Sequence, residues 1–68
     1  MDAEKRTEIG EKMRKLRGIR TQVGIARELG ISASAYRAYE YGERYPREKI
    51  RKRISKYFNV EESELFRT

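Results

Sequence analysis

Cationic side chains are the groups in this 68-residue sequence that are best able to do chemistry. Lysine and arginine number 17 against 11 aspartate and glutamate residues, which gives a formal net charge of +6 at pH 7 and a sequence pI near 9.9. Guanidinium and ammonium groups donate hydrogen bonds to anionic oxygens, and an excess of them attracts polyanions. We therefore expect an anionic partner.

The residue types on which most catalytic and metal sites depend are missing. The sequence has no cysteine and no histidine, which removes disulfides, thiolate zinc sites, thiol catalysis and the commonest metal ligand and general base. The neighbouring carboxylates Glu61 and Glu62 have no pocket-forming sequence around them. We expect no enzymatic activity, no metal, no cofactor and no small-molecule ligand.

Length and hydropathy limit the architecture. A chain of this size encloses one small core, so we predict a single domain over residues 1–68. No apolar run approaches the roughly 20 residues needed to cross a bilayer, and the N-terminal residues are charged where a signal peptide is hydrophobic. We therefore expect a cytoplasmic protein with no membrane partner.

The spacing of apolar residues predicts helices. Ile9, Met13 and Leu16 lie four and three positions apart and so share one helix face. A first helix is predicted over residues 4–17 or 8–17, and in the second case residues 1–8 form a flexible extension. Gly18 is well placed to end this helix.

Two further helices follow at close spacing. The second is predicted over residues 22–29, and the third over residues 33–41, with Ser32 as its cap. In the third helix the inward residues are Ala35, Tyr36 and Tyr39. The residues expected on or near its other face are Ala33, Ser34, Arg37 and Ala38.

The C-terminal part predicts a longer helix and a short closing one. Pro46 suits the first turn of a helix, and the inward stripe after it is Ile50, Ile54 and Phe58. Val60, Leu65 and Phe66 mark the closing helix, with Asn59 or Glu61 as its cap. The sequence thus predicts an all-α domain of five helices.

The segment 21–46 resembles the Cro/repressor-type (XRE) helix-turn-helix family. The family pattern is a Thr-Gln start, a Leu-Ala pair, a Leu-Gly-Ile-Ser turn, an aromatic-x-x-aromatic-Glu helix end and a Gly-Lys-Arg-x-Pro loop. The matching residues here are Thr21-Gln22, Ile25-Ala26, residues 29–32, Tyr36 to Tyr39-Glu40 and Gly42 to Pro46. The flanking segments IGEKMRKLR and YFNVEESELF resemble the family's first and last helices. The resemblance implies a compact lambda-repressor-like fold, with the helix-turn-helix at helices two and three, that binds double-stranded DNA.

The resemblance also implies residue roles. A helix in the major groove presents its N-terminal side chains to base edges; the residues at the corresponding positions are Ser32, Ala33, Ser34, Arg37 and Ala38. The residues that match the family's phosphate contacts are Gln22, Arg44, Tyr45 and Arg47. Glu40 matches a glutamate that pairs with an arginine of the first helix, here Arg17.

The expected function is that of a small dimeric repressor acting at the nucleoid. One reader helix covers half a site, so a homodimer is expected, and the family's closing helix places the contact at Val60, Leu65 and Phe66. The third helix, which would contact the bases, carries mainly small residues. Arg37 is therefore expected to supply most of the hydrogen-bonded discrimination between base pairs, with DNA shape supplying the rest.

Two other functions fit the same residues. One is a protein-interaction module, such as an antitoxin or bridging factor. The small number of long polar side chains on the third helix favours this alternative. The other is nonspecific coating of nucleic acid. The basic run after Pro46 is read as a solvated helix face whose charges attract DNA without contacting it; its members are Arg47, Lys49, Arg51, Lys52, Arg53 and Lys56.

Overall fold

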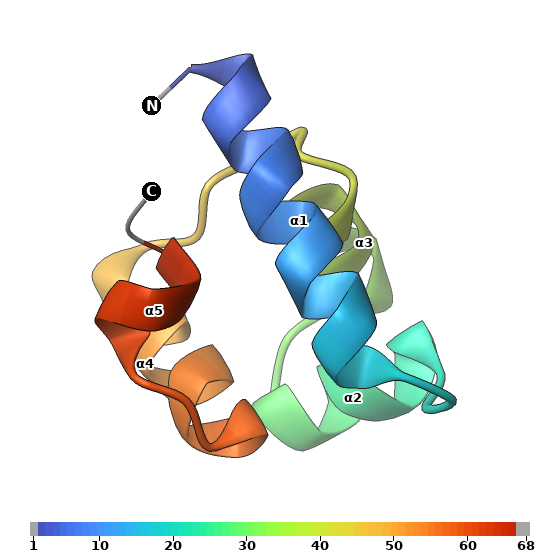
Figure 1. Ribbon diagram of the computed structural model, residues 1–68. Helices are drawn as coiled ribbons and strands as arrows, with labels where there is room; N and C mark the ends of the chain where they lie inside the picture. The colour runs from blue at the N-terminus through green and yellow to red at the C-terminus, as the bar shows by residue number, and fades with distance from the viewer. Residues whose placement is uncertain (1, 67–68) are drawn as a thin grey trace.

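The computed structural model describes residues 2–66, which form five helices. Their bounds are α1 (Ala3–Arg17), α2 (Gln22–Leu29), α3 (Ala33–Glu40), α4 (Glu48–Phe58) and α5 (Glu62–Phe66). The long α1 crosses in front of α3, and α4 and α5 lie together on the other side (Figure 1). No helix in this part of the chain combines the length and the apolar character that crossing a membrane requires. The predicted all-α, five-helix fold is confirmed.

The first helix begins earlier than either predicted start. The carboxylate of Asp2 accepts a hydrogen bond from the backbone N–H of Lys5 at 2.9 Å, which is the role of a helix N-cap. Residues 3–8 therefore belong to α1.

The ends of α4 and α5 also differ in detail from the prediction. Pro46 lies before α4, which begins at Glu48. Asn59 adopts the left-handed conformation, with φ at 57°, and ends α4 instead of starting α5. The backbone N–H of Glu61 donates to the carboxylate of Glu64 at 3.3 Å, so the start of α5 is stabilised by one half of a capping box.

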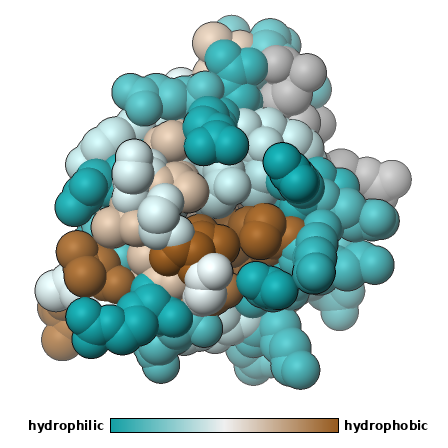
Figure 2. Space-filling model, turned by 180° about the vertical axis from the view of Figure 1, so that it is seen from behind, coloured by the Kyte–Doolittle hydropathy of each residue, from teal (hydrophilic) through white to brown (hydrophobic). Residues whose placement is uncertain are grey.

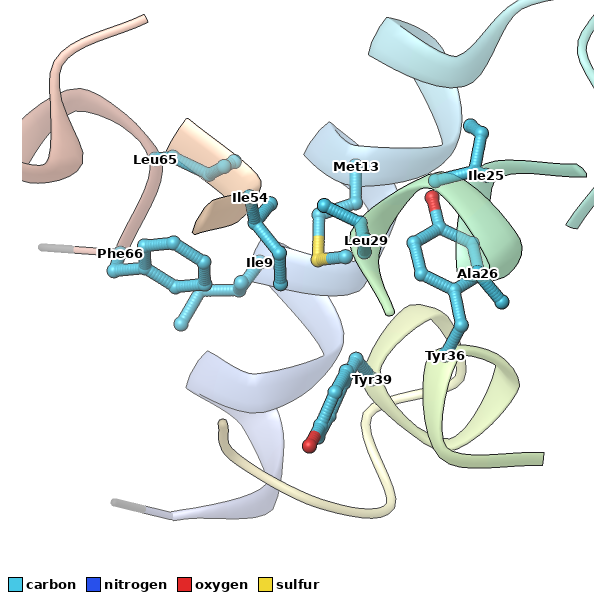
Figure 3. Packing of buried hydrophobic residues seen from close by; sticks show 10 residues of the cluster. All are labelled: Ile9, Met13, Ile25, Ala26, Leu29, Tyr36, Tyr39, Ile54, Leu65 and Phe66. Carbon is cyan, nitrogen blue, oxygen red and sulfur yellow. The ribbon is translucent and has the colours of Figure 1, made fainter. Parts of the chain in front are cut away.

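One apolar core joins all five helices. In the view of Figure 3, Met13 and Leu29 occupy the middle of the cluster. Leu65 and Phe66 are only 2% and 4% exposed, because α5 packs against α1 and α4 and closes the core. These two side chains are therefore not on the surface where a dimer contact was expected.

Helices α1 and α3 approach most closely at Gly10. A Cβ atom built there would lie 2.0 Å from the backbone oxygen of Glu40, a distance at which no side chain fits. Gly42 plays a similar part in the following turn, because its φ of 75° and its contact with Thr7 both disfavour a side chain. The crossing of α1 over the end of α3 thus depends on the absence of a side chain at Gly10.

We predict that Gly10→Ala destabilises the domain by about 1 to 3 kcal/mol, because the added methyl group forces α1 away from α3. The sign of the change in unfolding free energy is informative, because Gly→Ala at an uncrowded helix position stabilises a protein by up to about 1 kcal/mol. Urea unfolding at pH 7 measures the effect, with the exposed change Glu11→Ala in α1 as the control. An unchanged or higher unfolding midpoint for Gly10→Ala would show that the crossing is not tight.

Candidate nucleic-acid interface

A three-residue turn fixes the angle between α2 and α3. Gly30 ends α2 in the left-handed conformation, with φ at 75°, and the N–H of Ile31 donates back to the carbonyl of Ala26 at 3.0 Å, as in a Schellman motif. The hydroxyl of Ser32 then accepts from the N–H of Ala35 at 3.0 Å. Both helix ends are thus satisfied within the turn, so α3 leaves it in one direction.

The outward face of α3 is short and polar. Ser32, Ser34 and Arg37 are exposed, and Ala33 is half-buried against the core. Tyr36 and Tyr39 point inward, as predicted, and are buried. A probe approaching the start of α3 therefore meets two hydroxyl groups, one methyl group and one guanidinium.

Ala38 does not belong to this face, although it was expected to read bases. It is only 8% exposed, because the loop after α3 folds back over it. Its carbonyl accepts hydrogen bonds from the backbone N–H groups of Glu43 at 2.9 Å and Arg44 at 3.3 Å. Without Ala38, the expected base-reading positions are Ser32, Ala33, Ser34 and Arg37.

The loop that follows the C-terminal end of α3 carries exposed positive charge. Arg44 and Arg47 are exposed. Tyr45 is half-buried, and its ring packs edge-on against Phe66 with centroids 6.1 Å apart. The guanidinium of Arg51 lies 5.0 Å from the centre of the same ring. Tyr45 therefore anchors the loop to the core, while the two arginines on either side of it face solvent.

A buried carboxylate holds the other end of α3. The side chain of Glu40 is 0% exposed and forms a two-point ion pair with Arg17 of α1, with Nε to Oε2 at 2.6 Å and Nη2 to Oε1 at 3.2 Å. The remaining donor of Arg17, Nη1, reaches the carbonyl of Arg20 at 2.9 Å. The pair that the sequence implied is thus present and ties α1, α3 and the α1–α2 loop together.

Gln22 completes this cluster, a role that the sequence did not reveal. Its amide nitrogen Nε2 donates to Oε1 of Glu40 at 3.0 Å and lies 3.4 Å from the hydroxyl of Tyr41. A glutamine at a helix start looks the same in sequence whether its amide points to solvent or to a carboxylate. The structure gives Gln22 an internal partner at the outer edge of the helix-turn-helix.

The environment of Glu40 keeps it ionised. Burial alone would raise the pKa of this carboxyl, but the hydrogen bonds and the positive charge that it receives outweigh burial and hold its pKa below the ordinary value. The hydrogen bond to Glu40 raises the pKa of Arg17 in turn. Burial, reinforced by the nearby charge of Glu40, raises the pKa of Tyr36 far above its usual range, so the tyrosine stays neutral.

We predict that Glu40→Gln destabilises the domain by about 1 to 3 kcal/mol at pH 7, because the charged hydrogen bonds to Arg17 are lost. A carboxyl whose pKa is lowered by folding contributes stability above its unfolded pKa of about 4.3, and that stability disappears as the pH falls through the lower, folded value. The gap between the two proteins should therefore shrink between pH 5 and pH 3.

Urea unfolding of both proteins across that pH range measures the gap. The exposed change Glu11→Gln serves as a control for the loss of one carboxylate. A gap that is the same at pH 7 and pH 3 would show that the charge of Glu40 contributes nothing to folding.

Comparison with known proteins agrees with this geometry. The helix-turn-helix family model matches residues 11–65, a span that reaches from the middle of α1 into α5 and includes α2, the turn and α3. Neither the curated proteins nor the solved structures compared with the chain contains a match. The chain belongs to the helix-turn-helix family of DNA-binding regulators, of the Cro/repressor (XRE) type.

Proposed function

We propose that this protein is a sequence-specific repressor that binds duplex DNA as a homodimer, with α3 in the major groove. The observation that carries the proposal is the outward start of α3, together with the exposed arginines of the loop after α3 and the ion pair of Glu40 that holds the other end of the helix. A helix presented in this way fits the major groove, where its N-terminal residues meet base edges. Binding of this kind places the protein at the nucleoid.

Arg37 is the residue best suited to choose a base. Its long exposed side chain can donate two hydrogen bonds to the O6 and N7 atoms of guanine. Ser32 and Ser34 can bond to several bases, and the half-buried Ala33 can contact a thymine methyl group. The direct preference of each protomer thus depends mainly on one guanidinium, and sequence-dependent DNA shape contributes the rest.

The phosphate contacts fall on the loop and on the start of α2. Arg44 and Arg47 face solvent next to α3, where the backbone of a duplex in the groove would pass. Gln22 and Tyr45 are also proposed to contact phosphates, but to contribute less to binding. The amide of Gln22 already donates to Glu40, and the ring of Tyr45 packs on Phe66. These contacts set the position of the protein and carry no sequence information by themselves.

The dimer contact is proposed at a shallow groove between α1, α5 and the residue Val60 before α5. Its lining residues are Lys12, Lys15, Leu16, Val60, Glu64 and Leu65. Leu16 and Val60 are half-buried and give the groove an apolar floor, while Lys15 and Glu64 are exposed on its rim. In a twofold-symmetric contact the same surface of both protomers meets, and we assign Lys15 of one protomer to face Glu64 of the other. Of the three residues expected at the contact, Val60 and Leu65 line this groove, although Leu65 is only 2% exposed, and Phe66 does not line it.

One surface feature favours the alternative of a protein-interaction module. Ile19 is fully exposed in the α1–α2 loop, and Val23 and Tyr41 are 46% and 53% exposed. Figure 2, which views the molecule from behind Figure 1, shows a mostly hydrophilic surface around a smaller apolar area. Exposed apolar side chains are common singly, so Ile19 serves below as the test position for this alternative.

We predict that Arg37→Ala relaxes the preference at one base pair in each half-site and weakens binding to the selected site by about 1 to 3 kcal/mol. Selection of bound duplexes from a random pool, with the parent protein and the variant, measures both effects. Arg14→Ala, which removes one exposed charge from α1, is the matched control. The reader assignment fails if Arg37→Ala selects the same bases as the parent.

We also predict that Lys15→Glu weakens dimer formation about tenfold, because it sets two carboxylates against each other across the groove. The swap Lys15→Glu with Glu64→Lys should restore the dimer. Sedimentation equilibrium of the free proteins measures the association constant. A parent that stays monomeric even on a two-half-site duplex would contradict the dimer, and a loss of association in Ile19→Ser would move the interface to the α1–α2 loop.

A further inference from the structure

Four cations form a stripe along one face of α4. Their spacing of three, one and three positions places them on the same side of the helix, and all four are exposed. The members of this α4 stripe are Lys49, Lys52, Arg53 and Lys56. The stripe extends over about 10 Å along the helix axis.

The middle of the stripe lies against the turn that precedes α3. Arg53 donates from Nη1 to the carbonyl of Leu29, the last residue of α2, at 3.3 Å, and the same nitrogen lies 3.6 Å from the position of a Cβ atom on Gly30. Arg53 and Lys56 also line a shallow groove with Gly30. The stripe is therefore adjacent to the turn that precedes α3, the helix proposed to enter the DNA major groove.

The charges of the stripe are poorly compensated within the described part of the chain. Its ion pair there is between Lys52 and Glu48, with the nitrogen and oxygen 3.9 Å apart and both side chains about two-thirds exposed, an arrangement that contributes little in water. The nearby carboxylate of Glu28 accepts instead from the hydroxyl of Tyr57 at 2.7 Å. The cation on another side of α4, Arg51, is paired with Glu62 at 3.2 Å and bonded to the carbonyl of Pro46.

This arrangement has a cost for the isolated protein. Lys49 and Arg53, and likewise Lys52 and Lys56, are like charges four positions apart on a helix, and each such pair destabilises it by a few tenths of a kcal/mol. A regularly spaced polyanion relieves both repulsions at once. One strand of duplex DNA places a phosphate about every 3.4 Å along the axis, so a stripe of this length can lie within reach of more than one phosphate.

We infer that the α4 stripe binds the phosphate backbone of the same duplex, beside the bases that α3 meets. This inference rests on the proposed DNA binding and extends the contact beyond the loop arginines and the start of α2. The stripe adds affinity and fixes the inclination of the domain on the duplex, and it leaves the base preference unchanged.

The test is a double variant, Lys52→Gln with Lys56→Gln, which spares Arg53 and its structural hydrogen bond. Fluorescence anisotropy with the selected duplex, from 50 to 300 mM salt, gives the slope of log affinity against log salt concentration. Each phosphate contact contributes about 0.9 to that slope, so we expect it to decrease by about one to two for each bound protomer, or by about two to four for a dimer on two half-sites. Phosphate ethylation interference should lose one set of flanking phosphates in the variant.

The matched control is Lys5→Gln with Arg14→Gln, which also removes two positive charges, but from exposed positions of α1. It should keep the parent's slope and the parent's interference pattern, and circular dichroism confirms that both variants fold. Equal slopes and identical interference for the stripe variant and the control would overturn the inference while leaving the proposed function intact. A parent that shows no preference among duplexes would overturn the proposed function itself.

Discussion

The burial of one carboxylate at the end of α3 constrains the whole arrangement of helices. An unpaired charge in that position would cost several kcal/mol, and the side chain of Glu40 is fully shielded from solvent. It is satisfied when Arg17 arrives from α1 and Gln22 from the start of α2. The three helices must therefore meet in one geometry, and the direction of α3 is set before any DNA is bound.

Close backbone contact at the same place reinforces that constraint. The absence of a side chain at Gly10 lets α1 lie directly on the carbonyl of Glu40, and Arg6 donates from Nε to the carbonyl of Gly42 at 2.9 Å. The C-terminal half of α3 is thus fixed on several sides, while its N-terminal half is left outward. A surface ordered in advance loses little conformational freedom on binding, which favours affinity from a small contact.

The parts that sequence predicted are those governed by local spacing. Apolar residues three and four apart located the helices, and the family pattern implied the pair between Arg17 and Glu40 across 23 positions. Burial by segments outside a residue's own helix was missed. Ala38 is covered by a loop that folds back, and Leu65 is covered because α5 closes on α1 and α4. Nothing in the residues next to either position signals these contacts.

The domain has few side chains that could contact bases but many positive charges, and this contrast bears on how it would select a DNA site. One bidentate arginine discriminates by about 1 to 3 kcal/mol, whereas several phosphate contacts together supply much of the total affinity. Positive charge lies along the α3–α4 loop and α4, and Glu61 and Glu64 are exposed at the start of α5. On the proposed function, this asymmetry would orient the molecule in the field of the duplex before α3 enters the major groove. On the proposed function, charge therefore sets the orientation of the domain on the duplex, and Arg37 discriminates between bases in that orientation. Specificity then depends on how accurately the ion pair of Glu40 fixes the direction of α3.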